Sequence, residues 1–464
     1  MLGCQTTVDT SELSDDSVSI AYAEPITDYS PFSYESKDRK YLSNIYDPLV
    51  RYDASFNTDT ALAVAWGRLD DKTWEFRLRE GVVFHDGTAF DSEDVLYSFD
   101  VAMNSEESEL RDLLSGIVGV TASEDYRVQV QTSEPDPLLL NRLVNLYMVP
   151  NGFDDYITPT GTGPYFVSGF EDDTLILQRF NYYWGKLPYY AEARLRYLPS
   201  FVQRYESLID GDVQVLANVP PQFVENLESE GIELIDFPSL ESSFLMMNPN
   251  LVSQNVRDAA WSALSVTYFS ELGGGYLMPS GQYAASGIMG YVSNWLPVES
   301  ELIELTQRVN LTMDIPEGLE SLGAVIAEDL SEAGIDLELN SLPLDEFENK
   351  IYSGESELYF FGWKYDLADV SEFLEAVVHS SGEFNGIEYV DLELDRLIEE
   401  ASYTLDLTER RVLLEEIARS YFDEHVAYPL FEAKVLYGVH PSVHWPLRLD
   451  GLILASEIVE NVVE

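Results

Sequence analysis

The sequence predicts a mixed α/β protein with more than one domain. Its 464 residues exceed what a single hydrophobic core normally organises. A hydrophobic content of 45% with 23% charged residues is typical of a globular chain. Helix-like and strand-like patterns alternate between residues 203 and 237 and again between 319 and 362. This alternation predicts parallel or mixed sheets covered by helices, and no long linker separates the repeated units.

The strands are predicted from apolar and polar residues that alternate with a period of two. Trp74-Glu75-Phe76-Arg77-Leu78 is the clearest case, with apolar residues on one face and charges on the other. The expected strands, in chain order, are 18–22, 74–78, 118–121, 126–131, 174–180, 193–198, 213–216, 233–237, 335–339 and 358–362.

The helices are predicted where apolar residues recur on one face behind a capping residue. Asp91 can cap a helix whose first turn carries acids, which suit the positive end of the helix dipole. Val95, Phe99 and Met103 then fall on one face. The other expected helices are 203–210, 221–230, 319–333, 344–353, 392–401 and 407–425.

The charge is strongly one-sided. The chain has 26 Lys and Arg residues, of which seven are Lys, against 83 Asp and Glu residues, so its formal charge is −57. This excludes a nucleic-acid binder that works through a basic surface, and it argues against adsorption to anionic lipids. An acidic chain with few Lys residues suggests adaptation to high salt, a hypothesis that predicts loss of structure on dialysis into low salt.

Cys4 is the only cysteine, which excludes an intrachain disulfide and a cysteine-based metal cluster. It lies in Met1-Leu2-Gly3-Cys4-Gln5, which resembles the processing site of a lipoprotein, although a chance cysteine in a frayed terminus is the alternative. The chain contains no apolar run of 18 residues that could span a membrane. We therefore expect residues 1–17 to be a flexible acidic tether, with a lipid on Cys4 that anchors the protein to the membrane.

Several sequence blocks, taken in order, resemble the extracytoplasmic solute-binding proteins of ABC importers, in the family that binds peptides, nickel complexes and related solutes. The first block runs from Trp74 to Val95 and contains His85-Asp86-Gly87. The others are 159–165, 181–186 with 197–199, 334–339, 353–354 with 361–363, 391–395, and 410–422 with 429–431. The chain departs from the family pattern after Val256-Arg257, and residues 267–315 match it poorly.

The resemblance implies a periplasmic-binding-protein-like α/β fold with two lobes, mixed sheets, an additional domain and a ligand cleft between the lobes. Lobe I would combine residues 18–40, 160–243 and 436–464. Residues 41–159 would form the additional domain attached to lobe I, and residues 244–435 would form lobe II. The crossings near residues 243 and 435 would then act as the hinge.

The resemblance also implies where a ligand would bind. In Gly362-Trp363-Lys364-Tyr365-Asp366, the acid would hold the α-ammonium group of a peptide and Trp363 could form an aromatic wall. Gly362 and Tyr365 are the other ligand-binding candidates of this segment. Asp366 could instead be a helix cap or a solvated acid, Trp363 could pack in the core, and Asp369 is the neighbouring alternative acid.

Residues of the first loop form the second candidate segment. Phe32, Tyr34 and Ser36 would approach the ligand with backbone groups, although they could equally belong to an ordinary surface loop. The resemblance implies that main-chain hydrogen bonds would hold a peptide as an added strand. The side chains of the receptor would then be a poor guide to which peptides it selects.

The motifs do not indicate an enzyme. Neither Gly-x-Ser-x-Gly nor Gly-x-x-x-x-Gly-Lys-Ser/Thr occurs, and no Lys-Ser/Thr follows the glycine run 273–275. His440 and His444 have a metal-like spacing, but Pro441 and Pro446 predict an irregular loop there. We therefore expect no cofactor, no bound metal and no catalytic residue.

Taken together, the sequence predicts an extracytoplasmic receptor at the cell surface or in the periplasm. It would capture oligopeptides by lobe closure and deliver them to the permease subunits of an ABC transporter. We expect a monomer that binds no nucleic acid. A binder of nickel chelates, haem or oligosaccharides is the alternative on the same fold, and a hydrolase or a surface adhesin is the alternative of another class.

Overall fold

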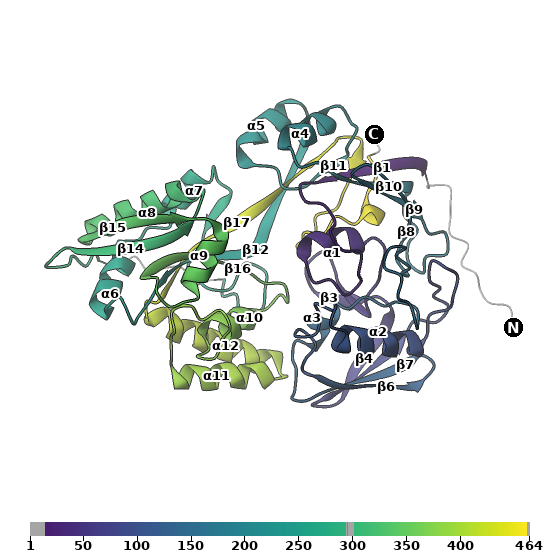
Figure 1. Cartoon of the computed structure of the whole chain (residues 1–464), viewed down its shortest axis with the longest axis horizontal. Coiled ribbons are helices and arrows are strands. Elements are labelled where there is room, and N and C mark those ends of the chain that lie inside the picture. Colours follow the sequence, from purple (N-terminus) through teal and green to yellow (C-terminus); the bar gives the residue numbers. More distant parts are fainter. Residues whose placement is uncertain (1–13, 294, 296–300, 462–464) are drawn as a thin grey trace. The chain divides into compact units, whose positions relative to one another are not determined.

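The computed structural model describes residues 14–293, 295 and 301–461. These residues form two compact units (Figure 1). Unit 1 holds the chain up to residue 134, residues 138–236 and the segment from residue 436 onward. Unit 2 holds residues 135–137 and 237–435.

Two strands carry the main crossings between the units. β12 (Glu233–Met247) contains the passage at 236/237, and β17 (Ala427–Val439) contains the passage at 435/436. The sequence placed these crossings near residues 243 and 435. The assignment of the units to lobes with a hinge stays a prediction.

Unit 1 is built on a mixed sheet with the strand order β17-β11-β1-β10-β9-β8. β1 pairs in parallel with both β10 and β11, and β10 pairs antiparallel with β9. The bounds are β1 (Ser14–Tyr22), β8 (Tyr165–Glu171), β9 (Thr174–Arg179), β10 (Tyr190–Tyr197) and β11 (Val215–Leu216), with helices α4 (Phe201–Ile209) and α5 (Val224–Ser229). The strand predicted over 18–22 begins already at Ser14, inside the segment predicted as a tether, because backbone pairing with β10 needs no apolar side chains.

A four-stranded antiparallel sheet of unit 1 has the order β4-β5-β7-β6 and carries α2 on one face (Figure 1). The predicted capping residue is confirmed, because Asp91 accepts from the Glu93 N–H at 2.8 Å while Asp94 accepts from the Asp91 N–H at 2.8 Å. The bounds are β4 (Ala63–Asp70), β5 (Thr73–Leu78), α2 (Ser92–Asn104), β6 (Ile117–Glu124) and β7 (Arg127–Thr132). Smaller elements are α1 (Ser36–Leu42), β2 (Val50–Tyr52), β3 (Thr58–Thr60), α3 (Leu139–Leu143), β18 (Val443–His444) and β19 (Val459–Glu460).

The glycine turn at 161–163 packs directly against the backbone of Ile45. A β-carbon on Gly161 would lie 2.2 Å from the Ile45 carbonyl oxygen, and one on Gly163 would lie 2.5 Å from it, so only glycine fits at either position. The His85 ring holds the same turn through both nitrogens. Nδ1 accepts from the Gly161 N–H at 3.2 Å, while Nε2 lies 3.1 Å from the Gly163 carbonyl oxygen, to which a protonated Nε2 donates.

Buried Asp47 joins this turn to the aromatic block at 181–186. Its Oδ2 accepts from the Trp184 indole N–H at 2.8 Å and from the Thr162 hydroxyl at 3.0 Å. The Arg79 guanidinium lies 4.3 Å from the centre of the Trp184 ring. Burial raises the pKa of Asp47, although the two hydrogen bonds oppose that effect. The sequence blocks that resemble the family therefore meet in the packing of unit 1.

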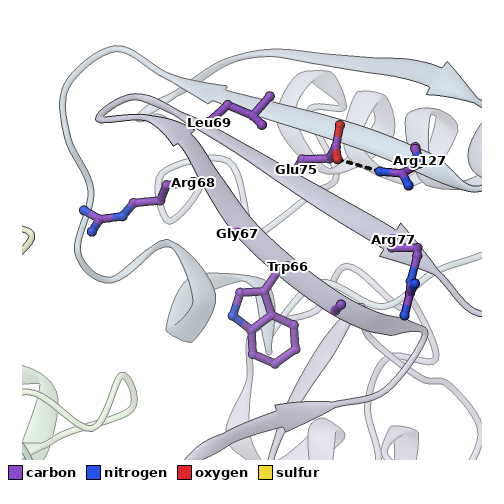
Figure 2. Close-up of a pocket in the computed structure, with 8 residues that line it drawn as sticks. Trp66, Gly67, Arg68, Leu69, Glu75, Arg77 and Arg127 are labelled. Carbon is purple, nitrogen blue, oxygen red and sulfur yellow. Dashed lines mark hydrogen bonds and ion pairs between the residues drawn. The ribbon is translucent and has the colours of Figure 1, made fainter.

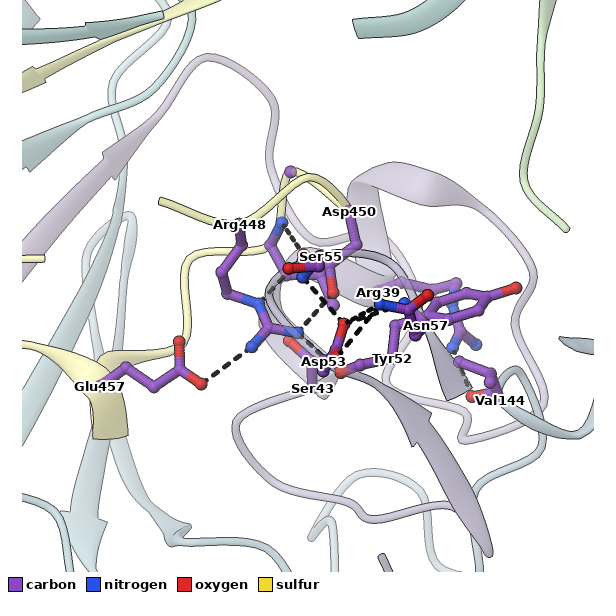
Figure 3. A network of polar contacts seen from close by, with 12 residues as sticks. Arg39, Ser43, Tyr52, Asp53, Ser55, Asn57, Val144, Arg448, Asp450 and Glu457 are labelled. Carbon is purple, nitrogen blue, oxygen red and sulfur yellow. Dashed lines mark hydrogen bonds and ion pairs between the residues drawn. The ribbon is translucent and has the colours of Figure 1, made fainter. Parts of the chain in front are cut away.

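The C-terminal segment is tied to the loop between β2 and β3 by the polar network drawn in Figure 3. Arg448 donates to the Tyr52 carbonyl oxygen at 3.0 Å, to Asp450 at 3.0 Å and to Glu457 at 2.8 Å. Because all three nitrogens of this guanidinium donate hydrogen bonds, two of the acceptors being charged, the cost of burying it is reduced. Asp53 shapes the same loop, and hydrogen bonds from backbone N–H groups hold the pKa of Asp53 below its usual range.

Unit 2 is built on a mixed sheet with the strand order β15-β14-β16-β12-β17, and β13 pairs with β17. β14 pairs in parallel with β15 and β16, whereas β12 runs antiparallel to β16. The strand bounds are β13 (Leu277–Pro279), β14 (Val309–Pro316), β15 (Ile335–Leu342) and β16 (Leu358–Lys364). The helices are α6 (Gln254–Ala263), α7 (Thr267–Leu272), α8 (Glu320–Glu332), α9 (Leu344–Ile351), α10 (Ser371–Phe373), the π-helix Leu374–Val378, α11 (Leu392–Tyr403) and α12 (Leu407–Asp423). The mixed sheets confirm the predicted α/β class.

The segment that matches the family poorly is part of the unit 2 core. Phe269 packs on Phe431 at 5.3 Å between ring centres, and Tyr283 is fully buried with its hydroxyl donating to the Ala427 carbonyl oxygen at 3.0 Å. The segment therefore contributes to the hydrophobic core although its sequence departs from the family pattern.

We predict that His85 makes the stability of unit 1 fall between pH 6.5 and 4. Burial lowers the pKa of His85 from 6.5 to about 4, so the folded state binds fewer protons than the unfolded state in this window. The stabilisation is complete above pH 6.5 and is lost as the pH falls towards 4, by about 2–3 kcal/mol. Denaturant unfolding of wild type and His85→Gln at pH 7 and pH 4.5 measures it. Equal pH slopes for the two proteins would contradict the prediction.

Candidate functional site

β16 brings the predicted residues 362–364 to one end of the unit 2 sheet. Its antiparallel register sets Gly362 opposite Ser243, Trp363 opposite Ser242 and Lys364 opposite Glu241. Side chains alternate between the two faces of a strand, so Gly362 and Lys364 share one face. Both are exposed, whereas Trp363 is half-buried.

The loop after β16 is held by hydrogen bonds at several points. Tyr365 is fully buried and its hydroxyl donates to the Tyr283 carbonyl oxygen. Met289 brackets the loop, because its N–H donates to the Ala368 carbonyl oxygen at 2.9 Å and its carbonyl accepts from the Val370 N–H at 3.0 Å. Ala368 has a φ of 59°, a left-handed conformation that costs an alanine energy and that these contacts maintain.

Asp369 fixes the end of this loop through a buried ion pair with Arg410 of α12. The guanidinium donates to both carboxylate oxygens, at 3.0 Å for Nη2 to Oδ1 and at a shorter distance for Nη1 to Oδ2. It also donates to the Ala401 carbonyl oxygen at 3.0 Å and to the Ser371 hydroxyl at 2.9 Å. Asp369 is only 2% exposed, so this alternative acid is occupied by an internal partner.

Asp366 lies on the same loop but faces solvent. Its side chain is 43% exposed, and Oδ1 lies 3.1 Å from the Lys364 Nζ. The hydrogen-bonded backbone on both sides therefore presents an exposed carboxylate that pairs with Lys364 and that a further donor can reach. Its contact with a ligand ammonium group stays a prediction.

Glu241 is a charged neighbour that sequence reasoning missed. It belongs to β12 and faces Lys364 across the strand pair. A β-carbon on Gly362 would lie 2.8 Å from Glu241 Oε1, so the carboxylate uses the space that the glycine leaves open. Burial raises the pKa of Glu241, and nearby Lys364 opposes that effect. Only the strand register could have identified this residue, because no local motif marks it.

Trp363 is surrounded by aromatic rings. Its ring centre lies 6.2 Å from that of Phe361, 5.6 Å from Phe384 and 6.3 Å from Phe373. Among the described residues its buried indole N–H has no hydrogen-bond partner. Trp363 therefore packs half-buried among aromatic side chains of unit 2, and a role as an aromatic wall stays a prediction.

The first-loop residues all belong to unit 1. Phe32 is buried, and its ring centre lies 6.1 Å from that of Tyr156 in an edge-to-face arrangement. Tyr34 is half-buried and its backbone N–H donates to Glu109 Oε2 at 2.6 Å. Ser36 is exposed at the first residue of α1. The backbone N–H of Tyr34 was predicted to donate to a ligand, and in this structure it donates to Glu109.

A shallow depression of about 320 Å³ lies on the four-stranded sheet of unit 1 (Figure 2). Trp66, Arg68 and Arg77 contribute to its lining, together with the ion pair between Glu75 and Arg127 at 2.7 Å. None of the predicted ligand-binding residues lines it, so it is separate from the segment around Asp366.

Four further sequence features concern a metal site, a membrane-spanning helix, His440 and Cys4, and the first three are tested by the described part of the chain. Within it, no His, Cys, Asp or Glu side chains gather in a group of three or more that could hold a metal ion. No helix there is long and apolar enough to cross a membrane. His440 Nδ1 lies 2.8 Å from the Ser442 hydroxyl oxygen, a contact within its own loop. Cys4 lies outside the described residues.

Residues 58–385 match the family described as bacterial extracellular solute-binding proteins, family 5 Middle. The chain is 25% identical to a probable di/tripeptide-binding protein of Pseudomonas aeruginosa, over 82% of this chain and 83% of that protein. It is 24% identical to the nickel-binding periplasmic protein of Escherichia coli, over 89% and 88% of the two chains.

Solved structures give the same fold. A periplasmic binding protein of Helicobacter pylori in complex with the peptide STSA has a TM-score of 0.75 and 22% identity, covering 96% of this chain and 98% of the other. A Brucella suis protein in complex with Fe(III)-EDTA has a TM-score of 0.85 and 18% identity, covering 96% and 100%. These likenesses confirm the predicted fold class.

We predict that Arg410→Met lowers the free energy of unfolding of unit 2 by about 3–5 kcal/mol, because the Asp369 carboxylate is left buried without its counter-charge. The double variant Asp369→Leu/Arg410→Met removes both charges and should recover most of that loss. Denaturant unfolding of the single and double variants measures the difference. If the single variant is as stable as wild type, the pair does not hold the loop.

Proposed function

We propose a peptide-capturing role for this chain, because it belongs to family 5 of the bacterial extracellular solute-binding proteins. Members of this family are transport receptors of ABC importers, so the chain is a receptor that works outside the cytoplasm and not an enzyme. Its partners are a solute and the permease of an ABC transporter.

The observation that carries the peptide proposal is the carboxylate of Asp366 on a rigid loop. A charge-assisted hydrogen bond from an ammonium group to a positioned carboxylate fixes the register of a ligand. Hydrogen bonds hold the backbone on either side of Asp366. The loop therefore loses less conformational entropy when such a contact forms. We propose that main-chain hydrogen bonds hold the rest of the peptide and that lobe closure encloses it, as the family resemblance implies.

A metal chelate is the second candidate solute. It is favoured by relatives such as the nickel-binding periplasmic protein of Escherichia coli. A chelate supplies its own metal ligands, so the receptor needs only to match the shape and charge of the chelate. Thermal shift with mixed short peptides, nickel chelates and sugars separates the candidates, because the solute that binds the folded state raises its melting temperature.

We predict that Asp366→Asn weakens peptide binding by about 1.5–3 kcal/mol in calorimetry, because a neutral amide replaces the charged partner of the ligand ammonium. The matched control is Asp336→Asn, which removes a half-exposed acid from an ion pair elsewhere in unit 2 and should leave the affinity unchanged. Unchanged affinity in Asp366→Asn would remove this residue from the site.

We further propose that the protein is a monomeric, membrane-tethered lipoprotein whose acidic surface is suited to high salt. The lipid attachment is supported by the sequence Leu2-Gly3-Cys4, and the suitability for salt by the charge of −57. The lipid would keep the receptor beside its permease without a spanning helix.

Lipid attachment predicts a specific mass. Cys4 of the protein isolated from its native organism should carry a diacylglyceryl group, which adds to the mass of the N-terminal peptide. Intact-mass analysis measures this, and an unmodified thiol at Cys4 would rule out the anchor.

A further inference from the structure

We propose that the arginine-rich depression on the four-stranded sheet of unit 1 docks a short acidic segment of a second protein. The depression has a volume of about 320 Å³, and its lining includes Trp66, Arg68, Glu75, Arg77 and Arg127 (Figure 2). None of the residues predicted to hold a solute belongs to this lining. The docking surface therefore goes beyond the proposed function and does not depend on it.

The lining is basic in a chain that is otherwise strongly acidic. Three of its eight residues are arginines, whereas Lys and Arg together make up 26 of the 464 residues of the chain. Its one acid is Glu75, so three positive charges and one negative charge give the lining +2, against −57 for the whole chain. An anionic group is therefore attracted to this place, although the chain as a whole repels it.

The strand register sets two of the arginines directly opposite each other. Arg77 of β5 pairs with Arg127 of β7, so both side chains leave the same face of the sheet. Like charges in this arrangement destabilise a sheet. Arg127 is compensated, because Glu75 lies 2.7 Å from its Nη1 and Glu124 lies 3.4 Å from its Nε.

Arg77 is the arginine that lacks a counter-charge. It is exposed, and in the part of the chain that the structure describes its guanidinium makes no hydrogen bond and no ion pair. Figure 2 shows it extending from the same strand as Glu75, whose carboxylate points to Arg127 instead. A carboxylate from outside would supply the charge that is missing here and would relieve the repulsion between the two arginines.

Small residues of β4 keep the approach to Arg77 open. In the register of β4 and β5, Ala65 stands opposite Arg77 and Gly67 stands opposite Glu75. Both small residues are exposed, and a β-carbon on Gly67 would meet nothing within 4 Å. β4 also lies at one end of the strand order, so no further strand of this sheet bounds the depression on that side. A partner side chain can therefore lie over β4 and reach the Arg77 guanidinium.

The shallow shape favours a protein segment over a small molecule. A small-molecule site buries about 70–90% of the surface of its ligand. Here Gly67, Arg68 and Arg77 are all exposed, and half-buried Trp66 lies among them. Trp and Arg are the residue types that anchor protein interfaces. An extended segment with acids at alternate positions presents its carboxylates on one side, as this surface requires.

Fluorescence anisotropy with a labelled acidic peptide tests the surface. The probe has four Glu-Ala repeats, and its acetylated and amidated ends prevent capture through a free ammonium group. Wild type should bind this probe, and the same peptide with Gln in place of Glu should not bind. Arg77→Gln should weaken binding roughly tenfold, because it removes a charge-assisted hydrogen bond. Glu75→Gln should strengthen binding roughly threefold, because it frees Arg127 from its partner.

The matched control is Arg111→Gln, which removes an exposed arginine of unit 1 outside the lining and should leave the affinity unchanged. Asp366→Asn should bind the probe as wild type does, and loss of binding in that variant would place the probe at the proposed solute site. The melting temperature of Arg77→Gln should equal or exceed that of wild type, because an opposed charge is removed. A lower melting temperature would assign Arg77 to the fold and overturn the proposal.

Three further results would overturn the docking surface while the proposed function stands. The first is that wild type does not bind the Glu peptide, or that Arg77→Gln binds it equally well. The second is that citrate binds as tightly as the peptide, which would assign the depression to a small anion. The third is a dimer of the wild-type protein in sedimentation that Arg77→Gln dissociates, which would assign the surface to a second copy of this chain.

Discussion

The buried ion pair between Asp369 and Arg410 is the contact on which the candidate site depends. Two charges leave water here, and the cost is offset because all three nitrogens of the guanidinium donate hydrogen bonds. The pair joins α12 to the loop after β16 and, through the Ala401 carbonyl, to the last turns of α11. With the loop fixed in this way, Asp366 is the acid left facing solvent.

Unit 1 shows a different use of the segments that resemble the family. His85, the glycine turn and Trp184 come from separate blocks, yet they meet around Ile45 and Asp47. Their polar groups bind one another within the fold. Both ring nitrogens of His85 contact the glycine turn, and the Trp184 indole N–H and the Thr162 hydroxyl both donate to Asp47. These motifs specify how unit 1 packs, and they therefore identify the fold more directly than they identify a binding site.

Because the chain has 83 Asp and Glu residues, composition cannot identify which acid belongs to the candidate site. Asp366 and Asp369 lie close together in the sequence and have the same side chain, but one is exposed beside a lysine and the other is buried against an arginine. What separates them is the course of the loop, which depends on partners in α12 and around Met289. Glu241 illustrates the same point, because a strand far away in the sequence carries it to Lys364.

The sequence by itself determined the α/β class, the capped helix at Asp91, most strands and helices, and the family to which the chain belongs. These follow from local periodicity, capping chemistry and turn residues, which act over a few neighbouring positions. Only the tertiary structure decided that β1 begins at Ser14, that Asp369 is an internal counter-ion, and that Glu241 stands over Gly362. Those outcomes depend on pairings between residues far apart in the chain, and no local pattern encodes which distant strand or helix supplies the partner.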